Sequence, residues 1–326
     1  MSTYNGLFMR DSMSDDGTVP SPGYIYYSPD IICHDQVADP QTFFKNNYTS
    51  DPNQPVQLGS SVNFVYSRVK NLSTGSNGGF INIYRSSSSL FMKPSIWKNN
   101  RLQTINGTPY LTLNPIDPGQ IGVGNDHFVL SALNSNLFCM VGIVSSEQEP
   151  AIPGDFSTYS DFVLWIRNNQ NICVRNLSLT QNFPNRNYER LDSFSNPESI
   201  AVPTLFKVTA TNLPAGTSFG VQCTPLNVNK SQTVDQGTIL TDSGMCPANF
   251  DGTVTTFGTL PSGTTVWPDN ARLEIEVYVG LDENDPATIY AEPWDTFVIK
   301  PHEMKGLRQN GTLVRIGSCG TEFINQ

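Results

Sequence analysis

Short apolar runs separated by polar turn residues recur along the chain, and they predict β-strands rather than helices. The clearest lie between residues 135 and 180, at positions 138–144, 162–166 and 172–179. Runs of this length, bounded by polar turn residues, are typical of buried strands. We interpret these three as the closing strands of a sandwich domain, with which the rest of the first half pairs.

The first half contains further strand patterns. In the run 61–70, one face of an imperfect period-2 pattern predicts a strand with one buried and one partly covered face. The residues of that face are Val62, Phe64, Tyr66 and Arg68. A short Pro-Ser-Ile-Trp segment ends at Trp97, whose indole we expect to fill one end of the core. The remaining predicted strands of this half are 28–33, 80–85, 110–113 and 127–130.

The second half shows the most regular alternation. Between positions 271 and 279, Leu273, Ile275, Val277 and Val279 alternate with polar or aromatic residues, which indicates a half-buried antiparallel strand. We predict the other strands at 204–211, 218–223, 253–257, 296–299 and 312–316.

Turn-rich segments suggest how the strands divide into domains. Residues 1–28 form a polar leader with several Asp, Gly and Pro residues, which we interpret as an extended N-terminal arm. A second turn-rich stretch, 181–200, is the expected connector between a sandwich at 29–180 and another at 201–326. The predicted fold class is therefore all-β, with two tandem antiparallel, Ig-like β-sandwich domains behind an N-terminal arm.

Composition supports this fold class and narrows the partners. The chain has 25 Gly, 23 Pro and only 15% charged residues, as expected where many turns join short strands. Its net charge of −10, with no run of Lys or Arg, argues against binding to nucleic acid or to an anionic membrane surface. We expect no cofactor, no membrane span and no Sec signal peptide, hence a protein made in the cytoplasm that stays there or leaves by a leaderless route.

Six cysteines stand at isolated positions with no CxxC pair. Cys139 and Cys173 lie inside apolar runs, where a thiol behaves as a small hydrophobic group. Cys223, Cys246 and Cys319 have more polar neighbours, so the sequence leaves one disulfide among them open while favouring reduced thiols.

The ordered strand motifs of the first half resemble those of a bacterial Ig-like (CARDB-like) β-sandwich family. The motifs at 28–32 and 63–71 resemble the pattern "PDI … NYVYVRVRN", and 81–84 followed by Trp97, 138–145 and 168–176 resemble its later strands. The resemblance covers residues 28–180, with the leader before Ser28 and a polar insert at 147–159 as departures. It implies a recognition or spacer module and no reaction. A weaker likeness around the Leu-Pro-Ala-Gly turn at 213–216 implies a second sandwich.

Candidate catalytic and metal-binding residues are sparse. His34, His127 and His302 are the three histidines, and none stands in a metal or catalytic motif, so we expect structural roles for them. Asp282, Glu283 and Asp285 form the densest acidic cluster, a weak candidate for a hard cation beside the simpler interpretation as a solvated hairpin loop. The leader carries three more acids, for which we prefer a solvated turn to a Ca²⁺ site: Asp11, Asp15 and Asp16.

Aromatic residues in or near loops are the main candidates for binding. Such side chains stack on sugars and form energetic centres of protein interfaces, although most of them cap the cores of their domains. The predicted binding residues are Tyr26, Tyr27, Trp97, Trp267 and Trp294.

These observations favour a non-enzymatic recognition or assembly module that binds a protein or glycan through sandwich end loops or edge strands. A component or cargo of a bacterial secretion or toxin system would have this design. Two alternatives stay open: a hydrolase or metal-dependent enzyme whose site is assembled from distant loops, and a self-associating structural protein.

Overall fold

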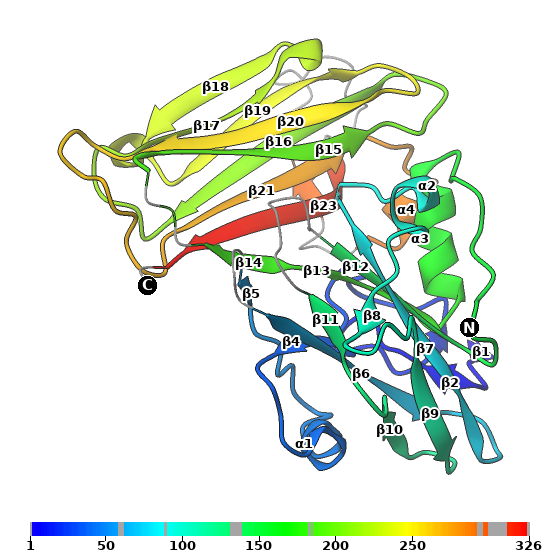
Figure 1. The fold of residues 1–326 in the computed structure, drawn as a ribbon. Coiled ribbons are helices and arrows are strands. Elements are labelled where there is room, and N and C mark those ends of the chain that lie inside the picture. Colours follow the sequence, from blue (N-terminus) through cyan, green and yellow to red (C-terminus); the bar gives the residue numbers. More distant parts are fainter. Residues whose placement is uncertain are drawn as a thin grey trace. The chain divides into compact units, whose positions relative to one another are not determined.

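The computed structural model describes residues 2–57, 62–87, 90–130, 139–181, 183, 185–291, 296–298 and 312–324. β-strands dominate and most pair antiparallel, so the all-β prediction is confirmed. The chain divides by its contacts into two compact units, coloured mainly blue to green and green to red in Figure 1. Unit 1 comprises residues 1–86, 92–156 and 161–177, and unit 2 comprises 87–91, 157–160 and 178–326.

Unit 1 contains two main sheets. In one sheet the central strand is β6 (Asn63–Asn71). Four strands pair with it: β2 (Leu7–Phe8), β4 (Ile31–His34), β10 (Ile121–Val123) and β11 (Phe128–Leu130). β11 also pairs with β8 (Gln103–Thr104). The other sheet has the order β13 (Ile172–Asn176), β12 (Cys139–Ser145), β7 (Asn77–Ser86), β9 (Leu111–Ile116). Short elements complete the unit: β1 (Ser2–Thr3), β3 (Thr18–Val19), α1 (Pro40–Asn46), β5 (Val56–Gln57) and α2 (Pro94–Trp97).

One predicted strand of this region is a helix. The run 162–166 lies in α3 (Tyr159–Asn168), so the strand interpretation was wrong. The buried apolar positions are Tyr159, Phe162 and Ile166, at intervals of three and four, which is the helical period. A five-residue apolar run cannot by itself separate a buried strand from a helix, because both produce it.

The N-terminal segment is part of the body of unit 1, which corrects its interpretation as an extended arm. Phe8 and Met9 are fully buried, and Met9 N donates to the carbonyl oxygen of Gln170 at 2.9 Å. Farther along, Ser28 N donates to Val174 O at 3.0 Å, next to an isolated bridge between Tyr27 and Arg175. The segment thus covers the outer edge of β13 and pairs with β6 through β2.

Unit 2 also contains two sheets. One has the order β15 (Asn187–Ser195), β20 (Asp251–Thr259), β17 (Ser218–Cys223), β18 (Val228–Thr233). The other includes β19 (Ile239–Cys246), β16 (Val202–Thr211), β21 (Arg272–Val279), β23 (Thr312–Phe323) and β14 (Ser178–Gln181) in that order, with β22 (Thr296–Val298) beside β23. β14 pairs with β23 in parallel. The short helices are η1 (Thr224–Leu226), η2 (Val234–Gln236) and α4 (Pro286–Ile289).

The predicted connector was wrong at 187–195, because these residues form β15. Its inward positions include Tyr188, Arg190 and Asp192, all buried, so the strand has no apolar alternation for a sequence pattern to detect. Arg190 and Asp192 pair at 3.1 Å, and Arg190 and Tyr188 also contact the Thr321 hydroxyl. Buried polar residues are tolerated where they find such partners.

The predicted buried face of β21 is confirmed. Leu273, Ile275, Val277 and Val279 are all buried. The opposite face is more buried than alternation suggests, because Glu276 accepts hydrogen bonds from other groups of the unit: Lys207 Nζ at 2.5 Å, Arg315 Nη1 at 2.7 Å and Tyr278 Oη at 3.0 Å.

All six cysteines are free and buried. Burial raises the pKa of the Cys33 thiol to about 12, and burial together with the nearby Cys223 raises that of Cys246 to about 12. Thiols with such pKa values are poor nucleophiles at neutral pH. Within the part of the chain that the structure describes, no helix is long and apolar enough to span a membrane.

Candidate binding patch

Most of the predicted binding aromatics are core residues. Trp97 is 0% and Trp267 1% exposed, and Tyr26 is buried, so these side chains present no surface to a ligand and their prediction as binding residues is corrected. Trp267 stacks on Phe323 with ring centroids 4.2 Å apart, which shows how burial of aromatic area stabilises a core. The expectation that Trp97 fills the core is confirmed. Tyr27 is exposed, and Trp294 lies outside the described residues.

The acidic loop in unit 2 serves local structure. Asp282 accepts from Asn284 N at 3.0 Å, and Asp285 caps α4 by accepting from Ala287 N at 2.8 Å and also accepts from the Ser160 hydroxyl. These contacts are those of a turn and a helix cap. Among the described residues, no group of three or more His, Cys, Asp or Glu side chains is placed to hold a metal ion. Glu283 is exposed on the same loop, and His302 lies outside the described residues.

Two of the three acids of the N-terminal segment, Asp11 and Asp15, are buried, which corrects the solvated turn predicted there. Asp11 is 1% exposed and accepts from the Ser21 hydroxyl at 2.6 Å, while Asp15 accepts from the backbone N–H groups of Asp11 and Gly17. Burial, reinforced by Asp15, raises the pKa of Asp11 well above its ordinary value. Burial raises the pKa of Asp15 to about 6. Asp16 remains exposed, and the hydrogen bonds from Thr18 lower its pKa.

A buried ion cluster around Asp30 fixes the loops of unit 1. The Asp30 carboxylate accepts from Arg10 Nη2 at 2.6 Å and from Arg68 Nε at 2.9 Å. Arg68 also donates to four backbone carbonyls, those of Pro29, Phe44, Asn47 and Ser50. The guanidinium of Arg10 lies 3.6 Å from the centre of the Tyr48 ring. All the strong donors of this cluster are used within the protein, so its role is structural.

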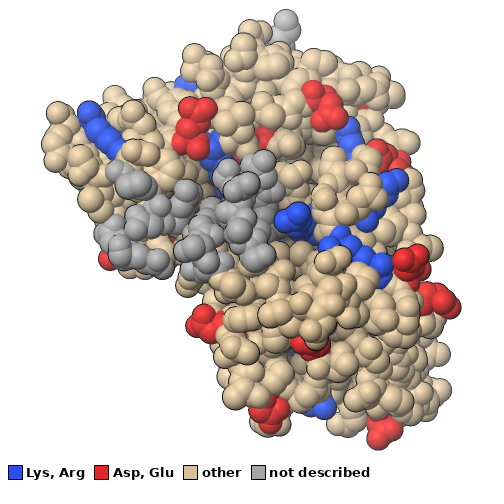
Figure 2. Space-filling view, viewed as in Figure 1, with Lys and Arg blue, Asp and Glu red and all other residues tan. Residues whose placement is uncertain are grey.

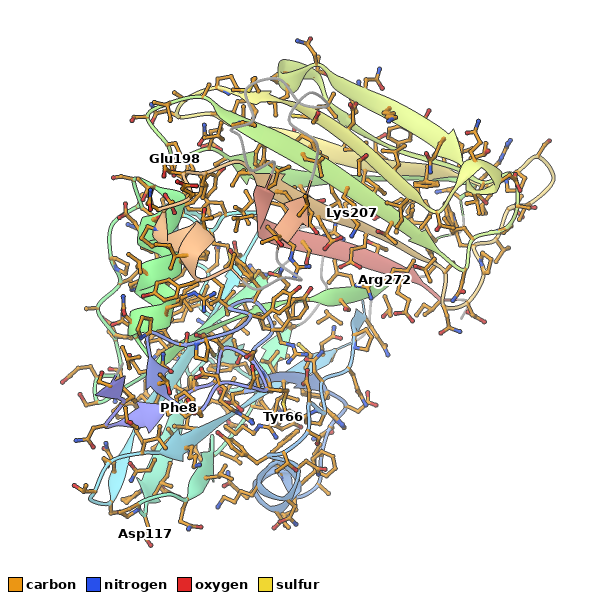
Figure 3. All side chains as sticks on the ribbon, turned by 180° about the vertical axis from the view of Figure 1, so that it is seen from behind. Phe8, Tyr66, Asp117, Glu198, Lys207 and Arg272 are labelled. Atoms are coloured by element: carbon orange, nitrogen blue, oxygen red, sulfur yellow. The ribbon has the colours of Figure 1, made fainter. Side chains whose placement is uncertain are left out.

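The most distinctive surface of unit 1 is an aromatic–histidine patch beside α1. Six rings form one connected cluster, with centroid separations between 4.7 and 5.9 Å. Phe44 and Tyr66 form the buried floor, and the other four rings are half-buried around it. Tyr66 is labelled in Figure 3, among the side chains of unit 1. The members of the patch are His34, Phe43, Phe44, Phe64, Tyr66 and His127.

Strand register explains how distant residues meet here. His34 of β4 and Val129 of β11 both lie directly opposite Phe64 of β6, so the three side chains share one face of the sheet. Helix α1 adds Phe43 and Phe44; its N-terminus is fixed by Pro40 and by the Asp39 carboxylate, which accepts from Thr42 N at 3.2 Å. The Tyr66 hydroxyl accepts from Val37 N at 3.0 Å, which ties the loop before α1 to the same cluster.

Polar groups flank the rings. His34 Nδ1 lies 3.0 Å from the carbonyl oxygen of Asp35, and His127 Nδ1 lies 3.5 Å from Asp126 Oδ1. Half-buried apolar rings with polar groups at their margin are the composition of protein interfaces and of ligand sites. The patch can therefore supply apolar contact area together with a small number of directed hydrogen bonds.

Sequence reasoning missed this patch. The sequence predicts separate structural roles for His34 and His127 and no role for Phe43 or Phe44, because the four residues come from three segments that only the fold brings together. One weak signal in the sequence points to the patch. Asp39-Pro40 is a typical helix start, and Phe43-Phe44 after it predicts two large rings on a short helix.

Charged side chains on the molecular surface form small separate groups of either sign between larger uncharged areas, on the face seen in Figure 2. This distribution agrees with a chain in which only 15% of residues are charged.

No protein-family model and no curated protein matches the chain. Among solved structures, the calcium-binding domain CBD12 of CALX1.1 is 8% identical, with 82% of this chain and 96% of that chain covered and a TM-score of 0.20. Fet3p, described as a multicopper oxidase that functions in iron import, is 11% identical, with 82% and 45% covered and a TM-score of 0.17. Scores this low carry no argument about fold or function.

Proposed function

We propose that the protein is a non-enzymatic recognition or assembly module, and that unit 1 binds a macromolecular partner through the aromatic–histidine patch. The observation that carries the proposal is the half-exposed ring cluster around Phe64, since clusters of this kind supply most of the free energy of protein interfaces. We further propose that the two units are tandem Ig-like sandwiches and that the chain serves a bacterial secretion or toxin system.

The sequence also suggested strand edges as contact sites. In unit 1, sheet faces are better candidates for contact with a partner than these edges. In unit 1 the edge of β13 is covered by residues 26–28, and β10 is capped by Gln41, whose Nε2 donates to the carbonyls of Val123 and Gly124. β9 exchanges hydrogen bonds with Asn125 through Thr112. Occupied edges of this kind oppose strand addition by a partner.

Site-directed photo-crosslinking tests the patch. A photoreactive phenylalanine analogue at position 64 should give a defined adduct in cells that produce the protein, whereas the same analogue at Ile239, an exposed apolar position of unit 2, should not. The purified partner should then bind the wild-type chain at least tenfold more tightly than Phe64→Ser. Equal crosslinking at the two positions would refute the proposal.

The identity of the adduct separates binding from self-assembly. A cross-linked second copy of this chain, together with a molar mass that rises with concentration in light scattering, would favour the structural alternative. A cross-linked different protein or a glycan supports recognition.

A further inference from the structure

The outer face of one sheet of unit 2 carries rows of exposed side chains, most of them polar and one of them, Glu189, charged. The strands β15, β20, β17 and β18 pair without a register shift, so outward residues fall into rows across the sheet. One row consists of Leu191, Thr255, Gln222 and Asn229, and all four are exposed or half-exposed. Neighbouring positions in such a row are about 4.8 Å apart, so a ligand that lies across the strands meets several of them at once.

An aromatic ring lies in the middle of the next row, beside the exposed carboxylate of Glu189 on β15. Phe257 stands opposite Gly220, and a Cβ built on Gly220 would meet the Phe257 ring at 2.4 Å from Cζ. The ring therefore lies down over the glycine backbone instead of standing away from the sheet. Ser231 follows Gly220 in this row and is exposed. The absence of a side chain at Gly220 leaves room for the ring, which is half-exposed.

The chemistry of these rows selects among ligands. Neither row contains Lys or Arg, so phosphate groups find no counter-charge there. Hydroxyl and amide side chains both donate and accept hydrogen bonds, which suits the hydroxyl groups of a sugar. The apolar area amounts to Leu191 and Phe257, which is little for a protein interface but is sufficient for stacking a sugar ring.

The adjacent edge of this sheet is closed. Asp242 Oδ2 accepts from Asn229 N at 3.1 Å, Lys230 Nζ donates to Thr241 O at 2.9 Å, and Gln232 Nε2 donates to Ile239 O at 2.9 Å. These bonds tie β18 to β19 of the other sheet, so a partner strand has no access to backbone groups at this end. What β18 offers to a ligand is its outward side chains.

We propose that this face binds a neutral polysaccharide, with the Phe257 ring as a stacking surface and Thr255, Gln222, Asn229 and Ser231 as hydrogen-bonding groups. The site is independent of the aromatic–histidine patch of unit 1. A single glycan chain lying across the strands would contact both rows.

Retention of the full chain on washed cellulose, chitin and starch granules tests this site, with heparin and polygalacturonate resins as charged comparisons. We expect saturable retention on at least one of the neutral polymers. Thr255→Lys should weaken it at least tenfold, because an ammonium group on the array blocks close approach. Thr211→Lys, the same change on an exposed position of the other sheet of unit 2, should leave it unchanged.

Two further variants distinguish loss of binding from a folding defect. Phe257→Ala removes the stacking surface, and Gln222→Lys places the charge on the neighbouring strand; both should reduce retention while circular dichroism stays that of the wild type. No retention on any neutral polymer, retention only on the charged resins, or equal retention of the wild type and the variants of this face would each overturn the proposal. The crosslinking test of unit 1 uses no residue of this face, so failure of this site leaves the proposal for unit 1 intact.

Discussion

The two units bury charge in different ways. In unit 1, Arg68 is fully buried and reaches carbonyl groups at Pro29, Phe44, Asn47 and Ser50, all of which precede it by 18 to 39 residues. In unit 2, Glu276 accepts from Lys207 and Arg315 on the strands directly beside it. The buried charges of unit 1 therefore connect its loops, whereas those of unit 2 lie between strands that backbone hydrogen bonds already hold together.

This difference predicts unequal losses of stability when a buried charge is removed from each unit.

Arg68→Met should have the largest effect. It leaves Asp30 with one of its two guanidinium partners and deprives four loop carbonyls of their donor, and breaking a buried pair in this way costs about 3–5 kcal/mol. Urea denaturation measures the loss in the free energy of unfolding. A cost near zero would show that the loops of unit 1 are held by packing alone.

Glu276→Gln should cost less, about 1–2 kcal/mol, because the amide retains one acceptor and Lys207 can turn toward water. The same denaturation experiment, read beside Arg68→Met, gives the comparison directly. Equal costs for the two variants would remove the distinction between the units.

Asp11→Asn should stabilise the protein at neutral pH, by about 1 kcal/mol, because a buried carboxylate that shares its surroundings with Asp15 is replaced by a neutral group of the same size. The gain should depend on pH in a definite direction. Folding raises the pKa of Asp15 to about 6 and raises that of Asp11 well above its ordinary value, so the folded state binds more protons than the unfolded state. The stabilisation from these protons is complete below about pH 4 and is lost as pH rises through the folded-state pKa values.

The difference in unfolding free energy between Asp11→Asn and the wild type should accordingly grow between pH 4.5 and pH 7. Thermal unfolding across this range measures it, with Asp16→Asn, an exposed neighbour, as the control. A difference that shrinks as pH rises would contradict the assignment of these two acids.

Lys230→Ala should have the smallest effect on stability, within about 0.5 kcal/mol, since its ammonium group is exposed. Its consequence should appear in association instead. Loss of the bond to Thr241 opens the edge of β18, so light scattering at increasing concentration should detect more oligomer than in the wild type. An unchanged molar mass would mean that Asp242 and Gln232 close the edge by themselves.

The hydrophobic pattern was sufficient to predict the all-β class, most strand positions and the buried face of β21, because a strand with one apolar face repeats every two residues whatever it packs against. It also placed Trp97 in the core. These properties are local, and a hydrophobic pattern reports them directly.

Several features of the fold and both proposed binding surfaces depend on tertiary contacts. In the structure, residues 162–166 are helical, and β15 is a strand with buried Tyr188, Arg190 and Asp192. The polar N-terminal segment packs into the body of unit 1. The patch around Phe64 and the rows around Phe257 likewise depend on cross-strand register. The physical reason is common to all of them: burial of a polar group and the meeting of two side chains each depend on a partner far away in the chain, and a local pattern of hydrophobicity contains no information about that partner.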